Sequence, residues 1–240
     1  MLSLQQLDWD SEFFGFRVGR LVGPFETVAA LSDALQAAAE NGIRLVYGAF
    51  DHKDNASHHI ALAVGGRFMD AKRTYELDLT RIQPTWINIE EADDDAHSHR
   101  QLRNLAWQAA EFSRFRLDGA LPEGSWERMY SLWMQNSVTG KLADAVLVER
   151  GDGRIIGMTT VSYRGKCGQI GLFAVDLKWR GRGIGRQLLD AAIQRCRAAG
   201  CEKLQVVTQG NNLAACRSYE LAGFHLIDEQ DIFHFWIERS

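Results

Sequence analysis

The chain has 240 residues, of which 46% are hydrophobic, 10% aromatic and 24% charged. These fractions are ordinary for a globular protein and exclude a disordered, collagenous or fibrous chain. Lys and Arg number 27 against 31 Asp and Glu, a formal charge of −4. This balance argues against a general nucleic-acid-binding protein, which would carry a basic excess. Any site for an anion must therefore be local.

The cysteine spacing favours free thiols over a zinc site or a disulfide framework, because the four cysteines include no C-x-x-C pair. No metal is expected for the same reason. The first ten residues contain neither a basic nor an apolar segment, and no stretch approaches the roughly 18 apolar residues of a membrane span. We therefore expect a cytoplasmic protein without a membrane span.

The composition changes near residue 82, between an alternating segment at 74–79 and an acidic run at 90–95. This change predicts an N-terminal half, residues 1–82, and a second domain, residues 83–240. Segments 44–79 and 203–237 share a pattern of strand, polar loop, helix and strand, which predicts that the first half is a degenerate copy of an α/β unit in the second. The matched positions are Ala56, Gly65 and Asp70 in one segment and Ala214, Gly223 and Asp228 in the other.

Beyond residue 82 the hydrophobic spacing predicts a mixed α/β fold. Strands are expected at 86–89, 145–149, 155–163, 169–176, 204–207 and 232–237, and helices at 96–112, 126–136, 184–199 and 213–221. The acidic run is expected at a helix N-terminus, where carboxylates face the positive end of the helix dipole. Asp152-Gly153 and Arg164-Gly165 are expected to turn the chain, so that the strands between 145 and 176 are antiparallel neighbours.

A glycine-rich loop follows the strand at 169–176 and opens the helix at 184–199. Its glycines let successive backbone N–H groups point into one concavity, and the helix adds its dipole, so the pattern is typical of a phosphate site. It lacks the G-K-[ST] of a Walker loop and the G-x-G-x-x-G of a dinucleotide fingerprint. The alternative is a plain strand-to-helix turn with solvated arginines. The glycines are Gly181, Gly183 and Gly185, and the cations around them are Lys178, Arg180, Arg182 and Arg186.

The loop Arg180-Gly181-Arg182-Gly183-Ile184-Gly185 resembles the R-x-x-G-x-G pyrophosphate loop of the GCN5-related N-acetyltransferases. A second signature of that family, N-x-x-A-x-x-x-Y-x-x-x-G-F, is similar to the segment from Asn212 through Tyr219 to Phe224. The resemblance implies an acyl-CoA N-acyltransferase fold and acetyl-CoA as the acyl donor. One departure is Leu177, where a proline often follows the strand in the family.

The resemblance also implies roles for individual residues. The N–H groups of Arg180 to Gly185 would hold the pyrophosphate, with Asn212 helping, and the strand end at Phe173, Ala174 and Val175 would pair with the pantetheine amides. Tyr219 would protonate the departing thiolate, a role typically worth 10²–10⁴ in rate. The alternatives are that Asn212 is only a helix N-cap and Tyr219 only a packing aromatic. The general base stays open among Asp70, Glu76 and Asp176.

The expected acceptor is a nucleotide-linked amino sugar of the TDP-4-amino-4,6-dideoxyhexose type, since segments 113–116 and 133–138 resemble family members that acetylate such sugars. Arg114 and Arg116 are planar bidentate donors suited to its diphosphate. Other acceptors, namely a protein N-terminus, a polyamine or another small amine, remain alternatives, as does a non-catalytic acyl-CoA-binding module. The first half has Ala61 where Tyr219 would be and no glycine-rich loop, so we expect it to shape the acceptor site or a homodimer interface. His58 and His59 lack matching ligands and are expected to be solvated.

Overall fold

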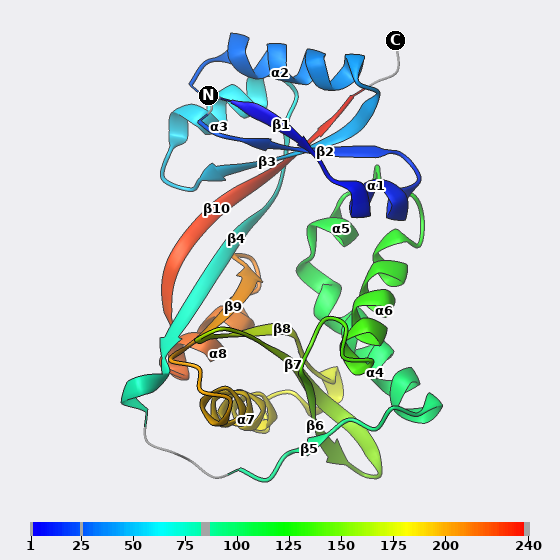
Figure 1. Cartoon of the computed structure of the whole chain (residues 1–240), viewed down its shortest axis with the longest axis vertical. Helices are drawn as coiled ribbons and strands as arrows, with labels where there is room; N and C mark the ends of the chain where they lie inside the picture. Colours follow the sequence, from blue (N-terminus) through cyan, green and yellow to red (C-terminus); the bar gives the residue numbers. More distant parts are fainter. Residues whose placement is uncertain (1, 25, 83–86, 238–240) are drawn as a thin grey trace. The chain divides into compact units, whose positions relative to one another are not determined.

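The computed structural model describes residues 2–24, 26–82 and 87–237 (Figure 1). The chain forms two compact units. Unit 1 consists of residues 1–72, 117–122 and 229–240, and unit 2 consists of residues 73–116 and 123–228. Both units are therefore built from separate stretches of sequence, and a division into domains at residue 82 stays a prediction. In the described ranges no helix is long and apolar enough to cross a bilayer.

Unit 1 contains strands in the order β1-β2-β3-β10-β4, of which β10 and β4 belong to it only in part. β2 runs parallel to β3, while β1 is antiparallel to β2 and β10 is antiparallel to β3. The sequence patterns predicted no element before residue 44, whereas the structure contains β1, α1, β2 and α2 there. The elements are β1 (Ser3–Gln6), α1 (Asp8–Phe14), β2 (Arg17–Val22), α2 (Val28–Glu40), β3 (Ile43–Asp51), α3 (Asn55–Ala63), the first part of β4 (Arg67–Asp78) and the second part of β10 (His225–Trp236).

Helices α2 and α3 pack against β3 and close the core of unit 1. Leu31 of α2 and Ala61 of α3 are both fully buried, among the rings of Phe50 and Phe233. The start of each helix is capped locally: Thr27 accepts from the N–H of Ala30, and an aspartate caps α3 in the same way.

Unit 2 contains strands in the order β9-β8-β7-β6-β5. β6, β7 and β8 are antiparallel neighbours, as predicted, and β8 runs parallel to β9. The elements are η1 (Leu79–Arg81), β5 (Glu90–Glu91), α4 (Ala96–Ala109), η2 (Ala110–Phe112), α5 (Arg114–Leu117), α6 (Ser125–Val138), β6 (Ala145–Gly151), β7 (Arg154–Arg164), β8 (Cys167–Val175), η3 (Leu177–Trp179), α7 (Ile184–Ala198), β9 (Lys203–Gln209) and α8 (Leu213–Leu221).

Most predicted elements of unit 2 lie within a few residues of their expected bounds, with four differences. Residues 87–89 are not a strand, and Trp86 lies outside the described residues. Glu90 and Glu91 pair with β6, so the acidic run reaches the helix only at Asp95, whose carboxylate caps α4. The second hairpin turns at Gly165 and Lys166, because Arg164 already pairs with Cys167. The final strand, β10, begins at His225 rather than at 232.

The sheet of unit 2 carries helices on both faces (Figure 1). Successive side chains of a strand point to opposite faces. Val146 and Val148 of β6 accordingly pack with α4 and α6, whereas Ala145 and Leu147 pack with α7 and α8. The mixed α/β fold class is therefore confirmed.

The predicted internal repeat has a strict register. Helix α3 covers Asn55–Ala63 and α8 covers Leu213–Leu221, an offset of 158 residues from Asn55 to Leu213. The same offset relates β4 to β10 over their whole length. At this offset the fully buried Ala61 corresponds to Tyr219, as the sequence predicted, and the cap Asp54 corresponds to the cap Asn212.

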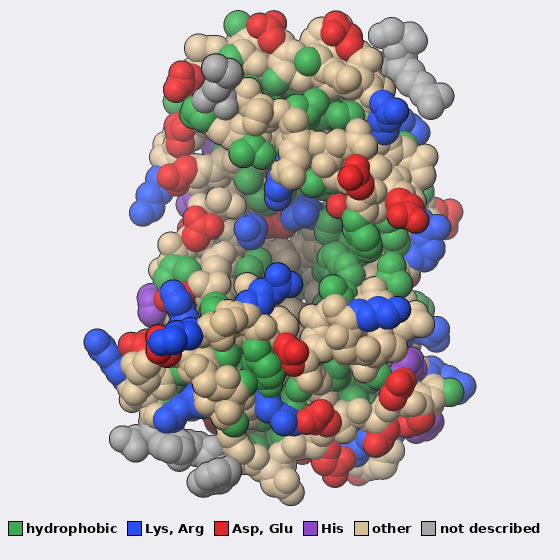
Figure 2. Space-filling view, in the orientation of Figure 1, with side chains coloured by type: hydrophobic (Ala, Val, Ile, Leu, Met, Phe, Trp, Pro, Cys, Tyr) green, Lys and Arg blue, Asp and Glu red, His purple; other side chains and the backbone are tan. Residues whose placement is uncertain are grey.

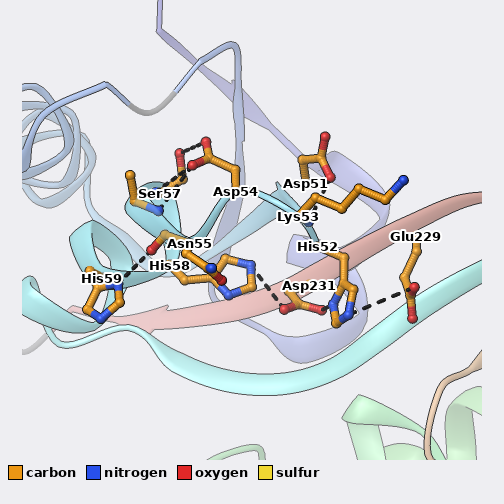
Figure 3. Close-up of polar contacts among 11 residues, drawn as sticks. Asp51, His52, Lys53, Asp54, Asn55, Ser57, His58, His59, Glu229 and Asp231 are labelled. Atoms are coloured by element: carbon orange, nitrogen blue, oxygen red, sulfur yellow. Dashed lines mark hydrogen bonds and ion pairs between the residues drawn. The ribbon is translucent and has the colours of Figure 1, made fainter.

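The prediction of a solvated His58 is wrong (Figure 3). Its Nε2 lies 3.0 Å from one carboxylate oxygen of the buried Asp231, and Nδ1 of His52 lies 2.8 Å from the other. One carboxylate of β10 thereby joins the turn after β3 to helix α3. The partner could not be foreseen because it lies far away in the sequence.

Charged side chains are interspersed on the face that Figure 2 shows, with Lys and Arg lying among Asp and Glu. All four cysteines are free thiols, three of them buried, and burial raises the pKa of the Cys196 thiol. Within the described ranges, no three His, Cys, Asp or Glu side chains gather as a metal site. Because the positive and negative side chains on this face are mixed, any anion site is set by local geometry.

Candidate active site

The pairing of strands β8 and β9 stops part-way along their length. Their parallel register runs from Cys167 and Lys203 to Ile170 and Val206, but β8 continues to Val175 and β9 to Gln209. A β-bulge against β7 sits where the two separate, and there the N–H of Leu172 donates to the Thr160 hydroxyl at 2.8 Å. Bulges redirect a strand and are frequent beside active sites.

The strand alternation decides which backbone groups face the gap. The N–H of Asp176 donates to the carbonyl of Ile156 in β7 at 2.8 Å. Groups of alternate residues point to opposite edges of a strand, so Phe173 and Val175 direct their N–H and carbonyl groups away from β7, toward the side that β9 has left. The Val175 carbonyl there accepts from Nε of Arg180 at 3.1 Å. Ala174, between them, is buried on the α4 side.

The glycine-rich loop forms an open cradle at the N-terminus of α7. Gly181 and Gly183 have φ values of +76° and +83°, which side chains rarely adopt, and a Cβ at either would meet no atom within 4 Å. Gly183 is the N-cap residue of α7 and has no side chain that could cap the helix. The first N–H groups of Ile184, Gly185 and the following turn have no partner within the helix, which suits an anion such as a pyrophosphate.

The cations of the loop have different local partners. Arg180 lies 3.6 Å from Glu111, and the guanidinium of Arg182 lies 4.7 Å above the ring of Trp179. Arg186 donates to both carboxylate oxygens of Asp190 at 2.8 and 2.9 Å, and this contact raises the pKa of its guanidinium. Arg180 and Arg182 are exposed, so both can turn toward an anion in the cradle.

Tyr219 is buried on α8 beside the diverging strand. Its ring centroid lies 5.9 Å from Phe173 of β8, 5.9 Å from Phe224 and 5.8 Å from Tyr75. Burial, and then the neighbouring Cys216 and Tyr75, raise the pKa of the Tyr219 phenol. The phenol is therefore fully protonated at neutral pH, which is the state that a general acid needs.

Asn212 caps α8, and its Oδ1 accepts from the N–H of Ala215 at 3.2 Å, as the structural alternative predicted. A cofactor contact of Asn212 stays a prediction. Of the three candidates for the base, Asp70 is buried in unit 1, while Glu76 and Asp176 belong to unit 2. Partial burial would raise the pKa of Glu76, but hydrogen bonds from Gln205 and Lys203 hold it below its usual value, which weakens it as a base.

The two arginines of α5 each stack on an aromatic ring. The guanidinium carbon of Arg114 lies 4.5 Å from the ring centroid of Phe115, and that of Arg116 lies 4.7 Å from Trp126. Arg116 is exposed, so it presents a flat cation–aromatic surface. The turn is held by Ser113, whose carbonyl accepts from the N–H of Arg116 at 2.9 Å.

Two residues that were not predicted from the sequence shape the cradle. Gln108 accepts a hydrogen bond from the N–H of Leu177 at 2.9 Å, and Trp179 packs with Ile156 and Ile184 under the loop. In the sequence, Trp179 stands between Lys178 and Arg180. An aromatic residue among the basic residues of the loop was therefore a signal from which its role could have been predicted. Nothing in the sequence marks Gln108, because its partner is 69 positions away.

The acetyltransferase (GNAT) family matches residues 100–224, more than half of the chain. The chain belongs to this family, as its two signatures predicted. It is 32% identical over 140 residues to the dTDP-fucosamine acetyltransferase of Escherichia coli, covering 58% of this chain and 58% of that protein. It is 37% identical over 60 residues to the mycothiol acetyltransferase of Propionibacterium freudenreichii, covering 25% and 19%. The chain thus spans less than two thirds of these relatives' length.

Solved structures with the same fold cover nearly the whole chain. A GCN5-related N-acetyltransferase from Sphaerobacter thermophilus superposes with a TM-score of 0.69 at 18% identity, covering 98% of this chain and 76% of that one. A tandem GNAT protein from the clavulanic acid biosynthesis pathway gives 0.59 at 14% identity, covering 93% and 76%. These likenesses confirm the predicted GNAT fold.

Proposed function

We propose that this protein transfers the acetyl group of acetyl-CoA to the amino group of a nucleotide-linked amino sugar, of the TDP-4-amino-4,6-dideoxyhexose type. The observation that carries the proposal is the open cradle of Gly181 and Gly183 at an uncapped helix N-terminus, directly after the free edge of β8. A pyrophosphate fits the cradle, and an amide-bearing chain fits the edge. These are the two chemical features of a CoA molecule that a protein backbone can bind without any side chain.

The reaction needs a polarised carbonyl and a proton donor. The amine attacks the thioester carbonyl, a C–N bond forms, and the C–S bond then breaks. A backbone N–H of Phe173 or Val175 would stabilise the negative charge that grows on the carbonyl oxygen. The phenol of Tyr219 would give its proton to the departing thiolate, while the proton lost by the amine goes to water.

The acceptor class is supported by the arginines of α5 and by one relative. A guanidinium stacked on an indole, as in Arg116 on Trp126, can bind a phosphate with its edge while its aromatic neighbour packs against a base or sugar. The dTDP-fucosamine acetyltransferase is the relative with the longest match quoted above. A cationic acceptor such as a polyamine would be repelled by the same two arginines.

The experiment is thiol release from acetyl-CoA with a panel of acceptors. The panel holds TDP-4-amino-4,6-dideoxyhexoses of galacto and gluco configuration, the 3-amino isomers, spermidine, an aminoglycoside and a short peptide. We expect turnover with TDP-amino sugars alone. Arg116→Ala is expected to raise the KM of that acceptor roughly ten- to a hundredfold, as the loss of a charge-assisted contact requires, without changing the KM of acetyl-CoA. Turnover restricted to the cationic amines would refute the acceptor class and leave the acetyl transfer standing.

A further inference from the structure

One side chain of α4 holds the backbone at the exit of β8. Oε1 of Gln108 accepts from the N–H of Leu177 at 2.9 Å, and its Nε2 lies 3.4 Å from Oδ2 of Asp176. Gln108 is partly buried, and its contact with Leu177 lies at the surface of unit 2. The segment it touches joins the free edge of β8 to the glycine-rich cradle.

The rest of that segment is held by its own strand and turn. The N–H of Asp176 donates to Ile156 at 2.8 Å, and Oδ1 of Asp176 accepts from the N–H of Lys178 at 3.0 Å. Within the described residues, the hydrogen bond from Leu177 to Gln108 is the one that ties this segment to helix α4 through Leu177. Gln108 therefore fixes the direction in which the chain leaves the strand.

We infer that Gln108 is a positioning residue for acetyl-CoA, which acts through Leu177 and does not touch the ligand. The inference rests on the cofactor site of the proposed function. A cradle made of backbone N–H groups binds an anion well only if these groups already point at it in the free protein. By holding Leu177, Gln108 sets the distance between the edge of β8 at Val175 and the first N–H groups of the loop. The pantetheine and the pyrophosphate of one acetyl-CoA molecule can then bind to these two places at the same time.

Replacing Leu177 by proline removes this N–H with little other disturbance. Asp176 has φ −50° and ψ 133°, outside the α region that a following proline disfavours. Leu177 is the first residue of the 3₁₀ turn, where proline is readily accommodated, and its side chain is 68% exposed. Leu177→Ala serves as the control for loss of the side chain alone.

The test is a double-mutant cycle on acetyl-CoA affinity, measured by calorimetry. Gln108→Ala in the natural chain is expected to weaken binding roughly three- to tenfold, the range of a single hydrogen bond. The KM of acetyl-CoA should rise by the same factor, with kcat at saturating acetyl-CoA unchanged. In the Leu177→Pro background the same substitution should change the affinity by less than half as much on a logarithmic scale, since only the 3.4 Å contact to Asp176 remains. Equal losses in both backgrounds would refute the inference.

Gln101→Ala is the matched control. Gln101 lies two turns earlier on α4, and its Oε1 accepts from the N–H of Ile155 at 2.6 Å, the same kind of contact made to a different strand. The two glutamine variants should lower Tm by similar amounts, but only Gln108→Ala should weaken acetyl-CoA. An equal loss of affinity in both would show that the effect is one of general stability and would refute the positioning role.

Gly183→Ala separates this inference from the cofactor site on which it rests. If Gly183→Ala weakens acetyl-CoA and Gln108→Ala does not, the cofactor site stands and the role of Gln108 is refuted. If Gly183→Ala binds acetyl-CoA as tightly as the natural chain does, the site is elsewhere and both proposals fail.

Discussion

Replacing Gly183 by alanine perturbs the cradle without creating a clash. The residue has φ +83°, and a Cβ there would meet no atom within 4 Å, so the cost to the free protein is backbone strain alone. A side chain in the left-handed region costs about 1–2 kcal/mol. For a chain of this size, that corresponds to a fall in Tm of roughly 2–8 °C.

The effect on acetyl-CoA should be larger than this strain suggests. The added methyl group stands in the open space beside the first N–H groups of α7, and relief of the strain turns those groups away from the ligand. Loss of one hydrogen bond to a charged group is worth about 1.5–3 kcal/mol, so affinity should fall at least about tenfold. Calorimetry with acetyl-CoA measures this change directly, and thermal unfolding measures the strain.

Gly153→Ala is the matched control for Gly183→Ala. Gly153 has φ +72° in the two-residue turn between β6 and β7, with Asp152 at φ +50°, and a Cβ there also meets no atom within 4 Å. Its substitution should cost the same strain and leave acetyl-CoA binding unchanged. If both variants weaken binding equally, or if neither does, the assignment of the cradle is refuted.

Three further substitutions test other parts of the structure. Tyr219→Phe should lower kcat roughly 10²–10⁴-fold with an unchanged Kd for acetyl-CoA. Tyr163, whose phenol pKa is raised by burial to about 12, provides the control, and Tyr163→Phe should leave kcat unaltered. Equal kcat values for the natural chain and Tyr219→Phe would refute the role of Tyr219 as the general acid. Asp118→Asn should cost about 1–3 kcal/mol in urea unfolding at pH 7. Burial raises the pKa of Asp118, but its hydrogen bonds from His234 and Trp236 outweigh this and lower the pKa below the unfolded value of about 3.9. The contribution is therefore complete above that value and lost as pH falls through the lower, folded pKa, so the deficit of the variant should shrink in acid; a deficit independent of pH would contradict this. Glu111→Gln frees Arg180 from a carboxylate 3.6 Å away and should tighten acetyl-CoA up to about fivefold at low salt; weaker binding would show that Arg180 needs Glu111 to be placed.

The local patterns of unit 2 could be predicted because each is set by neighbours in the sequence. Gly181 and Gly183 mark a loop only glycine can form, Asp152-Gly153 marks a two-residue turn, and Asn212 marks the start of α8. Helix α8 accordingly has the expected bounds. These signals depend on backbone conformation within a few residues, so they can be recognised without knowledge of the tertiary structure.

No element was predicted in the first forty residues, although they form two strands and two helices. Helix α2 is rich in alanine, and Leu31 and Ala38 are its buried residues, but Thr27 caps its start as Asn212 caps α8. That cap was a local signal that the prediction did not use. Long-range partners, by contrast, were out of reach. The carboxylate that holds His58 comes from β10, and the amide that holds Leu177 comes from α4. Both contacts depend on the order of the strands in the sheet, which local sequence patterns do not determine.

The pairing of β10 with β3 has a consequence for how the chain is made. Seven residues of β10, Gln230 to Trp236, pair with Asp51 to Leu45. All of unit 2 lies between Asp51 and Gln230 in the sequence. On the ribosome, β3 therefore emerges long before the strand that covers it. Its edge stays unpaired while about 180 residues are synthesised, which takes roughly 9–36 s at about 5–20 residues per second. Unit 1 begins the chain but is completed after unit 2, and an exposed edge of this kind invites pairing with other chains. We therefore expect chains released before β10 to aggregate through unit 1, even when unit 2 has folded.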